Sequence, residues 1–178
     1  MTEVDTPRGE VAALVSVQTA LAGRPGILSG ARALSHFGEH SIGWLAVSAV
    51  GALLQPSRRR DWLLVGAGAF AAHAAAVLVK RVVRRPRPHH PAVEVNVGTP
   101  SALSFPSAHA TSTTAAAMLL ARVTGLPLPA LLVPPMALSR LVLGVHYPSD
   151  VLAGVALGAA VASTASRLAG RVEGADHE

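Results

Sequence analysis

Long apolar runs, separated by short polar or proline-containing breaks, account for most of the chain. Five runs extend over residues 34–54, 62–83, 108–123, 128–145 and 148–168. Each approaches the roughly 20 residues that a helix needs to cross a bilayer. All are rich in Ala, Gly, Val and Leu, and small residues such as Gly154 and Gly158 let helices pack closely in lipid. The pattern predicts an all-α integral membrane protein, a bundle of five transmembrane helices.

A shorter apolar stripe precedes these runs. Val11, Leu14 and Leu21 share one face of a helix over residues 9–21, and Gln18 interrupts that face. This helix is too short to cross a bilayer, so we expect an amphipathic helix at the membrane interface. A sixth crossing would form if residues 9–28 span the bilayer with a bend.

These patterns predict one membrane-embedded domain over residues 1–178. It would comprise an N-terminal interfacial region (1–32), a transmembrane bundle (34–168) and a polar tail (169–178). Charged residues make up only 14% of the chain, against about 25% in soluble domains. The net charge is +5, but the arginines gather at the ends of apolar runs, so no nucleic-acid partner is expected. The absence of cysteine excludes disulfides and thiolate metal sites.

The connections should alternate between two membrane faces if all five runs cross. The long connection at residues 84–105 and the turn at 146–148 then share one face. The basic loop at 55–60, the turn at 125–127 and the C-terminus share the other. We expect a plasma-membrane protein. By the positive-inside rule this basic loop favours an extracytoplasmic first face, whereas the arginines on the first face itself favour the opposite orientation: Arg24, Arg32, Arg81, Arg84 and Arg85.

Three cations border this first face at the edge of the hydrocarbon. Lys80 and Arg87 flank the end of the second run, and Arg140 lies near the end of the fourth. Ionisable groups are costly there, which makes them candidates for function. Together they suit a phosphate dianion, which arginine can bind with two parallel hydrogen bonds. Ser107 and the backbone amide of Ala108, at a helix start, would add donors for the same anion.

Two histidines and one carboxylate lie beside these cations in the sequence. Asp150 follows His146 by four residues at a helix start, so its carboxylate can orient the imidazole as a nucleophile. His109 would protonate the leaving oxygen and then activate water. Asp150 is the only acid between Glu94 and Glu173, so no carboxylate cluster is available for magnesium. We therefore expect no metal and no cofactor.

In order and spacing, these fragments resemble the three-part signature of the type 2 phosphatidic acid phosphatase family. The family patterns KxxxxxxRP, PSGH and SRxxxxxHxxxD correspond to residues 80–88, 106–109 and 139–150, and the one departure is Ala108 in place of Gly. Alanine keeps the backbone amide that faces phosphate. The resemblance implies a metal-independent membrane lipid phosphatase in which His146 becomes phosphorylated, His109 is the general acid and Asp150 orients the nucleophile.

A second resemblance is to a small actinobacterial branch of this family that is assigned to cell-wall arabinan (arabinogalactan) synthesis. It rests on the opening MTEVDTPRGEVAALVSVQTAL and the stretch LSHFGEHSIGWLAV. The resemblance implies dephosphorylation of decaprenylphosphoryl-5-phosphoribose to decaprenylphosphoryl-ribose. Polyprenyl pyrophosphate, phosphatidylglycerol phosphate and phosphatidic acid also suit three cations beside hydrocarbon.

Four further residues are candidates for contact with the substrate. Arg84 and Arg85 could bind a phosphodiester, although attraction to anionic lipid headgroups is an alternative. Glu39 begins the first run on the same membrane face, where it could contact substrate or belong to an interfacial polar cluster. His73 lies two turns before Lys80 on one helix face, where it could line a pocket or pack between helices.

Two other kinds of protein compete with the phosphatase hypothesis. Haloperoxidases that bind vanadate resemble the same constellation, but they are soluble. A non-catalytic membrane scaffold for a prenyl-phosphate synthase is an alternative from another class. For the phosphatase, the expected partners are a polyprenyl-linked lipid phosphate and the bilayer. A homo-oligomer or an association with a phosphoribosyltransferase is a further hypothesis.

Overall fold

The computed structural model describes residues 6–175, and within that range it is helical, with one isolated β-bridge between Pro86 and Leu103. The all-α prediction is therefore confirmed. In chain order the elements are α1 (Gly9–Leu21), α2 (Ile27–Gly38), the 3₁₀ helix η1 (Glu39–Ser41), α3 (Ile42–Leu54), the 3₁₀ helix η2 (Pro56–Arg58), α4 (Arg59–Val83), α5 (Ala108–Thr124), α6 (Leu128–Val142) and α7 (Pro148–Ala175).

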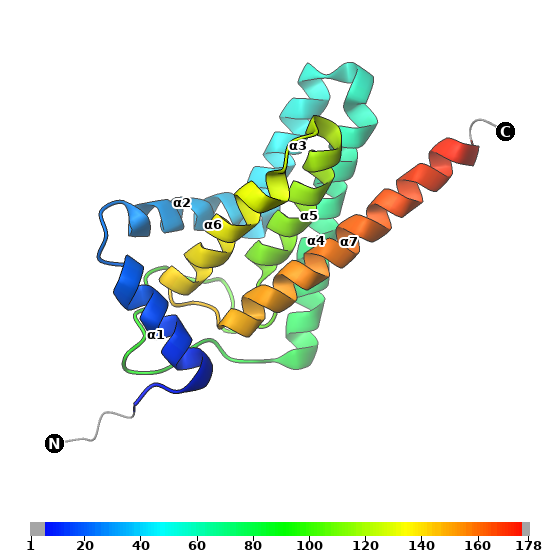
Figure 1. The fold of residues 1–178 in the computed structure, drawn as a ribbon. Helices are drawn as coiled ribbons and strands as arrows, with labels where there is room; N and C mark the ends of the chain where they lie inside the picture. The colour runs from blue at the N-terminus through cyan, green and yellow to red at the C-terminus, as the bar shows by residue number, and fades with distance from the viewer. Residues whose placement is uncertain (1–5, 176–178) are drawn as a thin grey trace.

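Helix α5 lies at the centre of the bundle, packed against α4, α6 and α7 (Figure 1). Two glycines allow the close approach of α7. A Cβ atom on Gly154 would lie 2.7 Å from the carbonyl oxygen of Ser107, and one on Gly158 would collide with the carbonyl oxygen of Thr111. The spacing of small residues in α7 thus serves backbone-to-backbone packing around α5, the helix that begins at the motif over residues 106–109.

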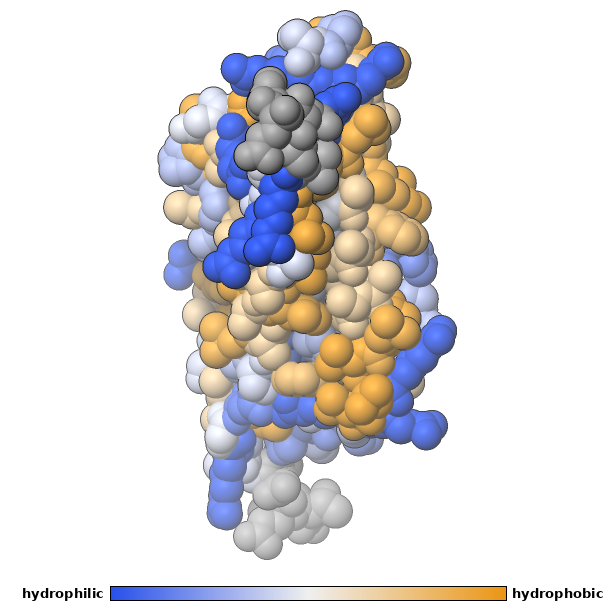
Figure 2. Space-filling view, turned by 90° about the vertical axis from the view of Figure 1, so that its right-hand side faces the viewer, coloured by the Kyte–Doolittle hydropathy of each residue, from blue (hydrophilic) through white to orange (hydrophobic). Residues whose placement is uncertain are grey.

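Three helical stretches are long and apolar enough to cross a membrane: residues 27–54, 56–83 and 148–171. Helices α5 and α6 are shorter, with 17 and 15 residues. The number of crossings, five or six, therefore stays a prediction. Figure 2 shows apolar residues over much of one face of the bundle, with hydrophilic residues mainly toward its ends. Leu53, Phe70, Leu78 and Leu152 are among the large apolar side chains exposed on the outside.

The first predicted crossing, residues 34–54, is wrong at its start. Helix α2 ends at Gly38 and lies across the bundle, whereas α3 begins at Ile42 and runs along it (Figure 1). His40 and Ser41 between them adopt left-handed backbone angles, with φ of 49° and 62°. Two left-handed residues cannot continue a right-handed helix, so the chain turns here. Residues 169–175 of the predicted polar tail continue α7, and the domain division itself stays a prediction.

The connections alternate between the two ends of the bundle as predicted. The loop at residues 84–107, the turn at 143–147 and α1 gather at one end, and the turns at 55–58 and 125–127 lie at the other (Figure 1). Helix α1 has the predicted bounds, and Gln18 anchors it to the motif end. Its Nε2 donates to the carbonyls of Glu94 (2.6 Å) and Val142 (3.1 Å), and its Oε1 accepts from Glu94 N–H. The interfacial placement of α1 stays a prediction.

Candidate active site

A cavity of about 450 Å³ opens at this end between α2, η1, α4, α5, α6 and the long loop. One part of its wall carries most of the residues that the motifs single out. These are Lys80, Arg87, Ala108, His109, Arg140 and His146. Segments far apart in the sequence therefore contribute their cations and imidazoles to one space.

The three cations are held by hydrogen bonds to backbone or hydroxyl oxygens rather than by carboxylates. Lys80 Nζ donates to the carbonyls of Leu103 (3.0 Å) and Ser104 (2.8 Å). Arg87 donates from Nε to one loop carbonyl and from Nη1 to the Val145 carbonyl at 2.7 Å. Arg140 is 1% exposed, and its Nε, which is buried, has no hydrogen-bond partner among the described residues. Positive charge without paired carboxylates is what a phosphate site requires.

His146 lies beside both a cation and the carboxylate expected to orient it. Its Nε2 is 3.3 Å from Nη1 of Arg87, which can only donate, so Nε2 is the accepting nitrogen and the ring proton lies on Nδ1. That Nδ1 faces Oδ2 of Asp150 at 3.6 Å. Burial lowers the pKa of His146 well below its ordinary value, and the cations Arg87, Lys80 and Arg140 lower it further. The imidazole is therefore neutral at physiological pH, with Nε2 facing Arg87 in the wall of the cavity.

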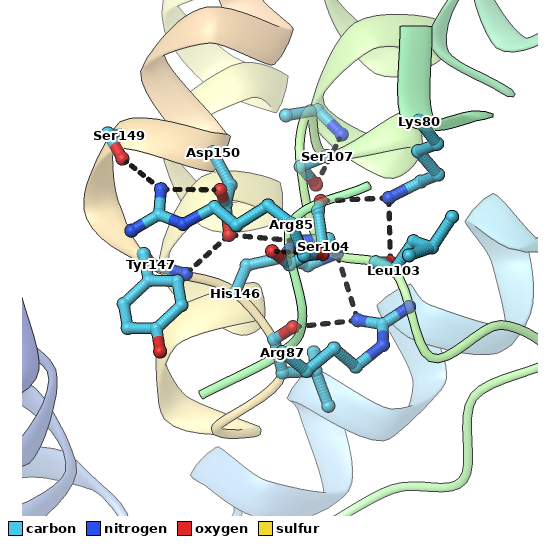
Figure 3. A network of polar contacts seen from close by, with 12 residues as sticks. Lys80, Arg85, Arg87, Leu103, Ser104, Ser107, His146, Tyr147, Ser149 and Asp150 are labelled. Carbon is cyan, nitrogen blue, oxygen red and sulfur yellow. Dashed lines mark hydrogen bonds and ion pairs between the residues drawn. The ribbon is translucent and has the colours of Figure 1, made fainter. Parts of the chain in front are cut away.

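Asp150 is fully buried and has a partner on each oxygen (Figure 3). Oδ2 accepts the N–H of Tyr147 at 2.8 Å, and Oδ1 accepts from Nη1 of Arg85 at 2.9 Å.

The guanidinium of Arg85 also donates to Oε2 of Glu10 at 2.6 Å and lies over the Tyr147 ring, 4.0 Å from its centroid. Burial raises the pKa of Glu10, but hydrogen bonds from Ser149 and Arg85 outweigh it, so the pKa is lowered. An ion-pair chain thus joins α1 to the carboxylate behind His146.

His109 and Arg140 share a partner on α2. Nε2 of His109 is 2.9 Å from the carbonyl oxygen of Ser35, which can only accept, so this nitrogen carries the proton. Nη1 and Nη2 of Arg140 donate to the Ser35 hydroxyl at 3.1 and 3.2 Å. The α2 helix therefore fixes both the expected general acid and one of the phosphate-binding cations.

Ser107 and Ala108 form the start of α5. The Ser107 hydroxyl accepts the N–H of Ala110 at 3.4 Å as an N-cap, and the Ser107 N–H donates to the Asp150 carbonyl. Ser107 is completely buried and does not line the cavity, whereas Ala108 does. The helix start faces the cations, where its positive dipole end favours an anion.

The geometry of the three motifs agrees with the comparison with known proteins. Residues 60–172 match the family described as the PAP2 superfamily. The chain belongs to the PAP2 superfamily. A curated relative from Mycolicibacterium smegmatis, named decaprenylphosphoryl-5-phosphoribose phosphatase, is 77% identical over 84% of this chain and 83% of its own. A relative of the same name from Mycobacterium tuberculosis is 68% identical over 92% of this chain and 93% of its own.

Two solved PAP2 structures share the fold. The transmembrane PAP2 type phosphatidylglycerolphosphate phosphatase from Bacillus subtilis has a TM-score of 0.70 at 20% identity, covering 90% of this chain and 86% of that one. LpxE from Aquifex aeolicus has a TM-score of 0.66 at 19% identity, covering 94% and 99%. Together with its long apolar helices, this PAP2 fold makes the chain an integral membrane protein.

The four additional candidates of the PAP2 site divide into two pairs. Glu39 and His73 line the cavity, as the sequence suggested. Arg84 and Arg85 do not. Arg84 is exposed at the end of α4 with a φ of 55°, and Arg85 is turned toward Asp150 and Glu10 by its ion pairs. Direct contact of these two arginines with substrate therefore has no support from their position.

Sequence reasoning missed two residues that organise the PAP2 site, Ser35 and Glu10. Ser35 contacts His109 and Arg140, but it precedes them by 74 and 105 residues, and no motif marks it. Glu10 is an acid at the start of a helix, and its partner Arg85 is 75 residues away. Among residues 6–175, no group of three His, Cys, Asp or Glu side chains is arranged to hold a metal ion. Metal independence itself stays a prediction.

Proposed function

We propose that this PAP2 protein removes the 5-phosphate from decaprenylphosphoryl-5-phosphoribose, giving decaprenylphosphoryl-ribose for cell-wall arabinan synthesis. The observation that carries the chemistry is a buried, neutral His146 whose Nε2 faces a site formed by Arg87, Lys80 and Arg140. The assignment of the substrate rests on the curated relatives. They are 68–77% identical to this chain over most of its length and are named decaprenylphosphoryl-5-phosphoribose phosphatase.

In the first step, the three cations hold the phosphate dianion while Nε2 of His146 attacks phosphorus in line with the leaving oxygen. The N–P bond forms and the bond between phosphorus and the ribose 5-oxygen breaks. That oxygen takes the Nδ1 proton of His109, which enters the step as an imidazolium while its Nε2–H stays donated to Ser35. Asp150, whose Oδ2 lies 3.6 Å from Nδ1 of His146, stabilises the positive charge that develops on the ring. The cations stabilise the charge on the transferring phosphoryl group.

In the second step, a water molecule enters where the ribosyl alcohol left. His109, now neutral with Nδ1 free of a proton, takes a proton from that water, whose oxygen attacks phosphorus. The N–P bond breaks, inorganic phosphate leaves, and His146 returns to its neutral form. Since Nε2–H of His109 is donated to Ser35, Nδ1 is the nitrogen left for both proton transfers.

We place this reaction at the extracytoplasmic face of the plasma membrane. The basic loop with Arg58, Arg59 and Arg60 lies at the end of the bundle away from the cavity, and the positive-inside rule assigns such a short loop to the cytoplasm. On α4 the exposed Leu78 follows Val77, which lines the cavity, so apolar surface for a long prenyl chain lies on the same helix as the cavity wall. Association with a phosphoribosyltransferase would supply that substrate directly.

The test uses full-length protein purified in detergent and a short-prenyl analogue of decaprenylphosphoryl-5-phosphoribose. We expect phosphate release that vanadate inhibits and EDTA does not change. His146→Ala should abolish turnover, whereas His89→Ala, an exposed loop histidine that does not line the cavity, should retain it. Wild-type turnover by His146→Ala would overturn the mechanism. Efficient hydrolysis of polyprenyl pyrophosphate or phosphatidylglycerol phosphate, with none of the phosphoribosyl lipid, would overturn the substrate.

A further inference from the structure

The cavity extends beyond the three cations to a second polar region where α2 meets η1. His36, Glu39 and His40 line it from this junction, and His73 lines it from α4. None of these residues belongs to the three motifs, and the mechanism above uses none of them. Their position raises the question of which part of a substrate they face.

The packing of α2 against His109 answers that question. The Ser35 carbonyl accepts from Nε2 of His109 at 2.9 Å, and Gly38 lies so close that a Cβ atom there would be 2.6 Å from Cδ2 of the same ring. The end of α2 is therefore in direct contact with the residue that protonates the leaving oxygen. Glu39 and His40 follow Gly38 in the chain and line the same cavity as His109 and the three cations, so they border the space beside the phosphate site that a substrate would enter.

The groups on this side are polar and available to a ligand. The Glu39 side chain is 45% exposed, and its nearest basic atom, Nδ1 of His36, is 3.9 Å away, too far for a hydrogen bond. Among the described residues that line the cavity, Glu39 is the only acid. The His40 and His73 rings lie 5.7 Å apart between centroids, and the buried Nδ1 of His73 has no hydrogen-bond partner among the described residues. Unpaired acceptors and donors of this kind call for a hydrogen-bonding ligand.

The backbone at this junction is held in an unfavourable conformation. His40 and Ser41 both have positive φ, which costs a non-glycine residue about 1–2 kcal/mol each. Ser41 is fully buried, and its hydroxyl reaches the Ala69 carbonyl of α4 at 3.5 Å. Such strain concentrates at functional sites, where the surrounding structure maintains it. Here it turns the chain so that Glu39 and His40 border the cavity.

We infer that Glu39, His40 and His73 form a subsite for the hydroxyl groups of a sugar whose phosphate ester occupies the cationic site. A carboxylate can accept hydrogen bonds from two neighbouring hydroxyls, and imidazoles can donate or accept. The same carboxylate repels a phosphate joined directly to the reacting one, which disfavours a pyrophosphate, whereas the phosphodiester of the phosphoribosyl lipid is separated from the 5-phosphate by the ribose ring. A diacylglycerol leaves these groups unpaired, because it brings ester oxygens and acyl chains in place of hydroxyls. This inference rests on the proposed function and names the part of the site that selects a phosphorylated pentose.

The test compares two substrates on full-length protein in detergent. One is the short-prenyl phosphoribosyl lipid, and the other is a short-chain phosphatidic acid, which carries a phosphate monoester without a sugar. The variant Glu39→Gln removes the charge and preserves the shape of the side chain. Glu94→Gln, at the same end of the bundle but outside the cavity lining, is the matched control. A second variant, His40→Ala, tests the imidazole independently.

We expect Glu39→Gln to lower kcat/KM for the phosphoribosyl lipid by about tenfold or more and to leave that for phosphatidic acid unchanged. His40→Ala should act in the same direction, and Glu94→Gln should change neither substrate. An equal loss on both substrates, or no loss on either, would overturn the subsite while leaving the proposed phosphatase intact. A wild-type protein that hydrolyses phosphatidic acid but not the phosphoribosyl lipid would overturn the proposed substrate, and the subsite with it.

Discussion

Nη1 of Arg85 donates to Oδ1 of Asp150 at 2.9 Å, so the carboxylate behind His146 is held by an arginine that does not line the cavity. The same arginine binds Glu10 at 2.6 Å, and Glu10 also accepts the N–H of Ser149 at 2.8 Å. The N-terminal helix is therefore connected to the first turn of α7, where the orienting carboxylate lies. We therefore expect α1 to help position Asp150 without lining the cavity.

Arg85→Gln should lower kcat by roughly tenfold to a hundredfold and leave KM almost unchanged. The substitution frees the Asp150 carboxylate to rotate away from Nδ1 of His146, and orientation affects the chemical step more than substrate binding. Arg60→Gln, an exposed arginine at the opposite end of the bundle, is the control. The measurement is steady-state kinetics of phosphate release in detergent. A raised KM with unchanged kcat would indicate that Arg85 contacts substrate instead.

Glu10→Gln should reproduce part of this effect, with a loss of kcat of about threefold to tenfold. Glutamine can still accept the N–H of Ser149 but no longer pairs ionically with Arg85, so the guanidinium is held less firmly over Asp150. Asp61→Asn, in the first turn of α4 at the other end, controls for the loss of one acidic charge. In the double variant with Arg85→Gln, the two losses should be less than additive, because both act through Asp150. Additive losses would show that the two residues act separately.

Much of the site could be predicted because its residues are linked by short spacings. Asp150, in the first turn of α7, follows His146, in the turn just before it, by four residues, so its carboxylate reaches back to the imidazole at 3.6 Å. The alternation of apolar runs likewise determined which connections share an end of the bundle. Such inferences depend on short spacings in the sequence and on the requirement to cross a bilayer. Contacts between residues far apart in the chain therefore affect them little.

The errors arose where the direction of the chain depends on distant contacts. The turn at His40 and Ser41 uses left-handed backbone angles without glycine, so no residue type in the sequence indicates it. For this reason the sequence predicted a single apolar run over residues 34–54. The contacts of Ser35 with His109 and Arg140 follow from that turn, because it lays α2 across the bundle. Arg85 was recognised as a charge near the site, but its partner depended on where α1 packs.

The pH dependence of the reaction should reflect the lowered pKa of His146. The nucleophile is active when neutral, and burial together with nearby cations holds its pKa well below 6.5. As the pH falls through 6.5, His146 stays unprotonated, so the nucleophile is not lost in that range. The test uses p-nitrophenyl phosphate, whose leaving group needs no proton. Its own ionisation is measured by titration and corrected for. The corrected kcat/KM should then decline only well below pH 6.5. An acid limb centred at 6.5 or above would contradict a buried, neutral His146.

Gly158→Ala should destabilise the bundle through the contact between α7 and α5. A Cβ atom at this position meets the Thr111 carbonyl, which belongs to the backbone of the central helix and cannot move without shifting the start of α5. Overpacking of this kind costs about 1–3 kcal/mol, which should appear as a lower unfolding temperature in detergent. Gly170→Ala in the same helix is the control, because a Cβ atom there meets nothing within 4 Å and alanine favours the helix. If both variants unfold at the wild-type temperature, α7 does not depend on this close approach, and the small residues of its GxxxG pair have no packing role.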